Sequence, residues 1–142
     1  HFTSAFGEHV IAFEVEEAMK ATVEKFPAQI TEFHLAPQVN PENGALPYHE
    51  WFIEFEKEPE NLQHFTEELD LALKMVNSDY EAKRHKDIAL GLPIVHQLQK
   101  GVFTNWLKSK GKLGGQHKVP RLSNDRKYIE EIIAVMNNRN TA

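Results

Sequence analysis

The sequence predicts an α+β domain: a small mixed or antiparallel sheet flanked by helices, with a ferredoxin-like β-α-β-β-α-β core and further C-terminal helices. Two segments alternate apolar and polar residues with the period of two that is typical of strands. Others place apolar residues three or four positions apart, which is helical spacing. The order of these segments matches the split-βαβ motif, in which helices cover one face of an antiparallel sheet. We therefore expect the second face to be free for solvent or a larger domain.

The first half of the chain supplies a strand, a helix and a hairpin. Residues 2–6 form a short apolar segment that Gly7 ends, and residues 13–26 have helical spacing up to Pro27. Residues 31–35 and 49–55 alternate as strands. The segment between them, P-Q-V-N-P-E-N-G-A-L-P, is rich in turn-forming residues. The simplest arrangement is two antiparallel strands joined by a long exposed loop.

The second half supplies helices and one more strand. An amphipathic helix extends to Val76 with Pro59 in its first turn. Ser123 or Asn124 is expected to cap the last helix. The elements between are a short helix over 79–86, a strand over 94–98 and a helix over 102–111.

Length and composition indicate a single soluble domain over residues 1–142. The chain has no cysteine, which excludes disulfides and thiol nucleophiles and is compatible with a reducing, cytoplasmic location. It contains no apolar run of roughly 18 residues, so no membrane contact is expected. Because it begins at His1 rather than Met, we interpret it as a piece of a longer protein.

Charge is distributed very unevenly along the chain. Residues 100–127 contain eight Lys or Arg and one acid, Asp125, for a net charge of +7, whereas residues 1–99 carry −11. A basic, glycine-rich segment in an acidic protein indicates contact with an anion. A nucleotide or phosphate fits better than nucleic acid, because the acidic remainder would repel a polyanion.

The segment K-G-K-L-G-G-Q-H-K within this region differs from a P-loop, because it follows a helix and leads into Val119-Pro120. We interpret it as a glycine hinge that delivers Gln116, His117, Lys118 and Arg121 towards an anion. Lysine supplies a mobile point charge and arginine a bidentate fork. A solubilising basic loop is an equally good interpretation of the residues alone.

Other polar residues have simpler interpretations. His34 and His49 lie on opposite strand faces, so we expect no shared metal and no metal site. The run Glu54, Glu56, Glu58 and Glu60 is expected to be a solvated strand face rather than a catalytic carboxylate pair. Trp51 and Trp106 occupy apolar stripes and are expected in the core.

Several motifs resemble the auxin-responsive, Gretchen-Hagen-type family of acyl acid–amido synthetases. G-G-Q-H-K-V-P-R is similar to its terminal Gln-x-Lys-x-Pro-Arg string, A-F-G-E-H-V to the opening of its C-terminal domain, and Y-H-E-W-F-I-E-F to the central strand. The resemblance covers nearly the whole chain in the right order. A further Leu-Asp and Asn-x-x-Tyr-x-x-x-Arg pattern is matched by Leu69, Asp70, Asn77, Tyr80 and Arg84.

The resemblance implies the C-terminal lid domain of an acyl-adenylate-forming enzyme. Such an enzyme uses ATP and Mg²⁺, bound mainly by a large N-terminal adenylation domain, to activate a small-molecule carboxylate and transfer it to an amine, typically an amino acid. It implies Lys118 as the catalytic cation. Its other site residues are Arg121, Gln116, His117 and Arg126 at the nucleotide phosphates and Gly7 and Glu8 on the acceptor side.

Two points stay open at this level. Pro120 to Arg126 also resembles the Pro-x-x-x-x-Gly-Lys ending of the wider superfamily, which would make Arg126 the cation with Asp125 in place of glycine. A stand-alone module that binds a small anion or peptide through an open sheet face is the alternative function. The isolated chain, without an adenine or acyl pocket, is expected to be inactive.

Overall fold

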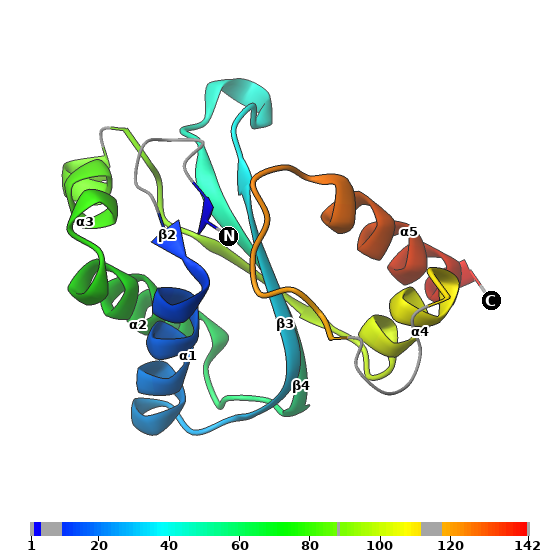
Figure 1. Ribbon diagram of the computed structural model, residues 1–142. Helices are drawn as coiled ribbons and strands as arrows, with labels where there is room; N and C mark the ends of the chain where they lie inside the picture. Colours follow the sequence, from blue (N-terminus) through cyan, green and yellow to red (C-terminus); the bar gives the residue numbers. More distant parts are fainter. Residues whose placement is uncertain (1, 4–9, 88, 112–117, 142) are drawn as a thin grey trace.

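A three-stranded mixed sheet divides the molecule into two layers of helices, as Figure 1 shows. The computed structural model describes residues 2–3, 10–87, 89–111 and 118–141. In the sheet, β3 (Gln29–Gln38) pairs antiparallel with β4 (Tyr48–Lys57), and β5 (Ile94–Leu98) pairs parallel with the other edge of β4. The short strands β1 (Phe2–Thr3) and β2 (Val10–Ile11) form a separate antiparallel pair.

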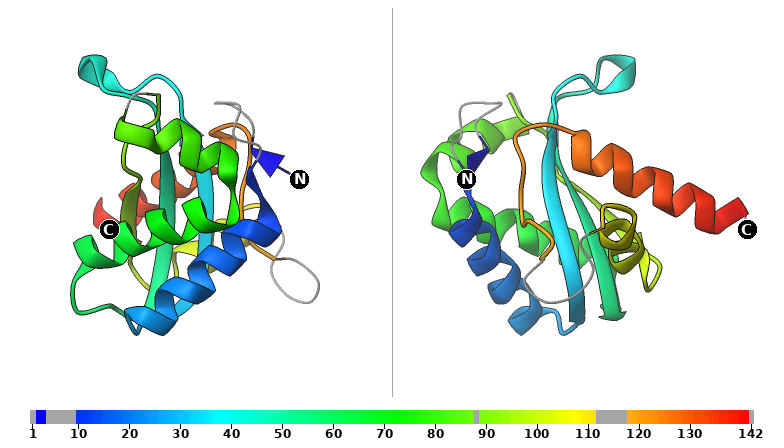
Figure 2. Two further views of the ribbon diagram at one scale, coloured as in Figure 1. Left: turned by 90° about the vertical axis from the view of Figure 1, so that its left-hand side faces the viewer. Right: turned by 45° about the vertical axis from the view of Figure 1, so that its right-hand side comes forward.

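Helices pack against both faces of the sheet, which Figure 2 shows from two further sides. One face meets α1 (Ala12–Lys25) and α2 (Leu62–Val76), followed by α3 (Ser78–Arg84). The other face meets α4 (Val102–Ser109) and α5 (Lys127–Thr141). Two short 3-10 turns, Glu42–Gly44 and His85–Asp87, complete the elements.

Alternation along the strands supplies apolar residues to both faces, because successive side chains point to opposite sides. The first core contains Trp51 and Ile53 of β4 with Phe65 and Leu69 of α2. The second core contains Phe52 of β4, Leu98 of β5, and side chains of α4 and α5, among them Trp106, Ile129 and Ile132. Trp51 and Trp106 are both almost fully buried, as the sequence predicts.

The α+β class and the mixed sheet are confirmed, and the pairing of the strands differs from that of a regular ferredoxin-like core. Among the described residues, β5 lies directly beside β4, and β1 pairs with β2 instead of entering the larger sheet. The second face of the sheet is not free, because α4 and α5 cover it. Each of these helices has an apolar stripe, and Phe52 and Leu98 offer the apolar surface that buries it.

Helix starts also differ from expectation by a few residues. Helix α2 begins at Leu62, after Pro59, and the side chain of Asn61 caps it by accepting from the His64 N–H. Helix α5 begins at Lys127, whose N–H donates to the Asp125 carboxylate rather than to Ser123 or Asn124.

The free edge of β3 carries a short parallel extension. The N–H of Leu35 donates to the Arg121 carbonyl over 2.9 Å, and the N–H of Ser123 donates to the Leu35 carbonyl over 3.1 Å. The segment 119–123 therefore runs along the sheet edge before α5 starts on the side of the second face (Figure 1). This is the segment that the sequence singles out for an anion.

Glu54 corrects the expectation of a solvated acidic strand face. Its side chain is buried, and its two oxygens accept from the N–H groups of Gly101 and Phe103 over 3.1 and 3.0 Å. Gly101 has φ +91°, the left-handed region that suits glycine, and directly precedes α4. A carboxylate of β4 thus satisfies the otherwise unpaired donors at the start of α4.

The Glu54→Ala variant should lose about 3 kcal/mol of unfolding free energy, because the buried N–H of Phe103 and the part-buried N–H of Gly101 lose their charged acceptor. The matched variant Glu56→Ala removes only an exposed ion pair with Lys100 and should cost under about 1 kcal/mol. Urea unfolding of both variants measures the difference. Equal losses would show that Glu54 does not hold α4.

Candidate functional site

Lys118 is an exposed residue at the point where the chain joins the sheet edge. The next residue, Val119, is buried in the second core, and Leu122 is buried in the first. Within the described part of the chain, no carboxylate forms an ion pair with Lys118. The predicted site residues Gln116 and His117, and the acceptor-side residues Gly7 and Glu8, lie outside the described residues.

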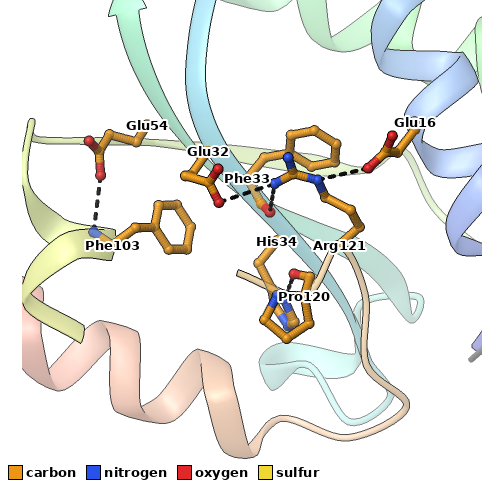
Figure 3. Close-up of polar contacts among 8 residues, drawn as sticks. All are labelled: Glu16, Glu32, Phe33, His34, Glu54, Phe103, Pro120 and Arg121. Atoms are coloured by element: carbon orange, nitrogen blue, oxygen red, sulfur yellow. Dashed lines mark hydrogen bonds and ion pairs between the residues drawn. The ribbon is translucent and has the colours of Figure 1, made fainter. Parts of the chain in front are cut away.

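Arg121 contacts the domain on several sides, as Figure 3 shows. Its Nε donates to Glu16 of α1 over 3.0 Å, while Nη1 donates to the Phe33 carbonyl of β3 over 3.2 Å and lies 3.4 Å from the Glu32 carboxylate. The guanidinium also stacks on the Phe33 ring, 4.3 Å from its centroid. A phosphate contact by Arg121 stays a prediction, and it would require these partners to be exchanged.

Burial raises the pKa of Glu32, and the neighbouring Arg121 offsets this effect only in part. The backbone N–H of Val119 also lowers this pKa. Glu32 therefore contacts the Arg121 guanidinium, and its pKa also responds to the residue after Lys118. Its negative charge depends on these partners because the site is partly removed from water.

His34 fixes the same segment from the second face of the sheet. The ring is fully buried, with Nδ1 2.7 Å from the Pro120 carbonyl and Nε2 3.1 Å from the Ser123 hydroxyl. Because a carbonyl only accepts, Nδ1 carries the proton that it donates to Pro120. Burial lowers the pKa of His34, so the neutral ring is the favoured form. His49 packs on Tyr80 beside the first core, which confirms that the two histidines occupy opposite faces.

Arg126, the alternative cation, binds the sheet rather than projecting away from it. One of its nitrogens lies 2.7 Å from Glu50 and 3.4 Å from the Pro37 carbonyl. Glu50 also accepts from His96 over 2.6 Å. Burial alone would raise the pKa of Glu50, but His96 and Arg126 together lower it below its usual value. This cluster ties the start of α5 to β4 and β5.

A second contact holds the chain before the glycine-rich segment. Lys110 lies 3.1 Å from Glu131 of α5 and packs against the rings of Trp106 and Tyr128. The Trp106 Nε1 donates to the same carboxylate over 2.8 Å. The basic segment is thus attached to the domain on both sides of residues 112–117.

The Leu-Asp and Asn-x-x-Tyr-x-x-x-Arg pattern forms a buried polar cluster. Asp70 of α2 accepts from the Tyr80 hydroxyl over 2.7 Å and from two nitrogens of Arg84 at 2.8 Å each. Asn77 caps α3 by accepting from the Tyr80 N–H. Burial opposes the charge on Asp70, yet Arg84 and Tyr80 hold its pKa below the usual value. These residues join α2 to α3, so their role is structural rather than catalytic.

The described residues contain no group of three or more side chains suited to hold a metal ion. No helix in the described ranges is both long enough and apolar enough to cross a membrane. The expectation that this domain holds no metal stays a prediction.

A family described as "GH3 family C-terminal domain" matches residues 13–127, which is most of the chain. This chain belongs to the GH3 family. The match confirms the resemblance in the sequence motifs and contains Lys118, Arg121 and Arg126. No curated protein matches the sequence.

Two solved structures share the fold of this GH3 domain. A "GH3.15 acyl acid amido synthetase" has a TM-score of 0.72 and 13% identity, over 94% of this chain and 24% of its own length. "AtGH3.15 acyl acid amido synthetase in complex with 2,4-DB" has a TM-score of 0.63 and 16% identity, over 86% and 22%. The GH3 domain described here thus spans about a quarter of these structures.

Sequence reasoning finds the cations of this GH3 domain but misses the acids that hold them. Glu16, Glu32 and Glu50 are partners of Arg121 and Arg126 across large sequence separations. The spacing of residues along the sequence does not predict such contacts, because the acids and the 119–126 segment come together only when the chain folds. The acidic charge of residues 1–99 was the one available signal.

The buried neutral His34 should make stability fall as the pH drops below about 6.5, the ordinary histidine pKa. In that range the unfolded chain binds a proton that the folded chain does not, until the lowered folded pKa is reached. In the parent protein, the urea midpoint of unfolding should be lower at about pH 5.5 than at about pH 7.5. In His34→Gln the two midpoints should lie closer together. The exposed His64→Gln serves as the control. An unchanged pH dependence in His34→Gln would contradict the assignment.

Asp70→Asn should lower the unfolding free energy by about 4 kcal/mol, because it leaves the buried Arg84 without its charged partner. The exposed Asp79→Asn, in the first turn of α3, should cost at most about 1 kcal/mol. Denaturant unfolding checks both values. The Asp70 contribution is present above its ordinary pKa and is lost as the pH falls through its lowered folded pKa.

Proposed function

We propose that this domain is the mobile C-terminal lid of an ATP-dependent acyl acid–amido synthetase, and that Lys118 is its catalytic cation. One observation carries the proposal: Lys118 is exposed and without an ion-pair partner among the described residues, on a segment bonded to the sheet edge. The other two candidate cations, Arg121 and Arg126, are each bound to carboxylates. Membership in the GH3 family supports the same assignment.

The proposed reaction has two steps. A carboxylate oxygen of the acyl acid attacks the α-phosphorus of ATP, and pyrophosphate leaves to give an acyl-adenylate. The amine then attacks the acyl carbon, loses a proton, and displaces AMP to form an amide. A large N-terminal domain would hold ATP and Mg²⁺, which offsets the charge of the leaving pyrophosphate.

Lys118 would stabilise the charge that develops at the phosphates during the first step. A cation already held in place does this without further reorganisation, which lowers the barrier more than a mobile charge in water would. Closure of the lid would also keep water away from the hydrolysable acyl-adenylate. The acidic remainder of the domain is consistent with a small phosphate target and not with nucleic acid.

The alternative, a stand-alone module that binds an anion or peptide, relied on an open sheet face. Helices α4 and α5 cover that face, so the alternative loses the surface it requires. The structural relatives are about four times longer than this chain, which favours a domain that works with another.

In a full-length enzyme that contains this domain, Lys118→Ala should reduce kcat for adenylation by a factor on the order of 10² to 10³, the range for loss of one transition-state donor. The KM for ATP should change little, because the contact forms mainly in the transition state. ATP–pyrophosphate exchange measures both. Lys108→Ala, an exposed lysine of α4, is the matched control. Equal behaviour of the two variants would refute the proposal.

A further inference from the structure

Arg121 lies three positions after Lys118 and holds the intervening backbone against two different elements. Its guanidinium joins α1 through Glu16 and β3 through Glu32 and the Phe33 carbonyl. A lysine could not make these contacts together, because its ammonium lacks the planar fork and does not stack in the same way. The contact therefore depends on arginine geometry and not only on positive charge.

The residues between Lys118 and Arg121 are fixed as well. Val119 is buried in the second core. The Pro120 carbonyl accepts from His34, and the Arg121 carbonyl accepts from the Leu35 N–H. The side chain of Val119 and the carbonyl groups of Pro120 and Arg121 thus each have a different partner. Fixing the backbone of one residue costs about 1–2 kcal/mol in conformational entropy. Because this segment is already ordered in the folded domain, that cost does not arise again during the reaction.

We propose that Arg121 is a positioning residue for Lys118 and not a ligand of the nucleotide. Glu16 and Glu32 take part in this role because they hold the Arg121 guanidinium in place. This inference rests on the proposed function of Lys118. The residues after Lys118 are bonded to the sheet edge, so the direction of Lys118 is set from the side that Arg121 anchors. Arg121 affects the reaction only by setting the position of the Lys118 ammonium.

The surroundings of Arg121 argue against direct phosphate binding. To reach a phosphate, the guanidinium would have to leave two carboxylates and a carbonyl. Glu32 would then keep its charge in a partly buried site without its main partner. The same two carboxylates also repel a phosphate that approaches Arg121. The two roles therefore predict opposite effects when the carboxylates are removed.

The first test is the double variant Glu16→Ala/Glu32→Ala in the full-length enzyme. If Arg121 positions Lys118, kcat for pyrophosphate exchange should fall about tenfold or more at a nearly unchanged KM for ATP, as expected for a small displacement of a catalytic group. If Arg121 binds phosphate, loss of the competing carboxylates should leave kcat unchanged or raise it, and this result would overturn the inference. Glu17→Ala/Glu24→Ala, also on α1, matches the change in charge.

The second test is a double-mutant cycle between Lys118→Ala and Arg121→Lys. Arg121→Lys keeps the charge but loses the fork, and should lower kcat about tenfold when Lys118 is present. In the Lys118→Ala background it should have no further effect, since a positioning residue has nothing left to position. Independent, multiplicative losses would overturn the inference.

The cycle also separates this inference from the proposed function. If Lys118→Ala is as active as Lys108→Ala, the proposed function of Lys118 fails. If Lys118→Ala is impaired while the Arg121→Lys effect persists in that background, only the positioning role fails. Circular dichroism of each variant confirms that the comparison is made between folded proteins.

Discussion

The pairing of residues 119–123 with the free edge of β3 is the constraint on which the rest of this structure depends. Two backbone hydrogen bonds around Leu35 make it, and two side chains reinforce it, because Val119 enters one core and Leu122 the other. The same pairing places the start of α5 at the second face of the sheet. Without it, α5 would lack a fixed start and Lys118 would lack a fixed position.

Buried carboxylates give this acidic domain much of its internal order. Glu54 satisfies the start of α4, Asp70 joins α2 to α3, and Glu50 joins the start of α5 to the sheet. Each carboxylate is paired with several donors, which is the condition under which burial of a charge is tolerated. The predicted surface role of the acidic strand residues was wrong for Glu54 because a partner helix covers that face.

Cations and anions are separated along the sequence but brought together by the fold. Two of the three candidate cations, Arg121 and Arg126, are matched with acids from α1, β3 and β4. Lys118 is the exposed one, at the start of the anchored segment. Under the proposed function, the cation directed at a phosphate is therefore Lys118, and Arg121 has the positioning role inferred above.

Local patterns in the sequence determined the α+β class, the hairpin of β3 and β4, the amphipathic helices and the opposite faces of His34 and His49. These follow from the repeat of side-chain direction in strands and helices, which depends only on near neighbours. The tertiary structure alone decided that β5 lies beside β4, that α4 and α5 cover the second face, and that Glu16 and Glu32 hold Arg121. Those choices depend on which apolar surfaces and charges meet after the chain has folded back on itself, and sequence spacing carries no record of that.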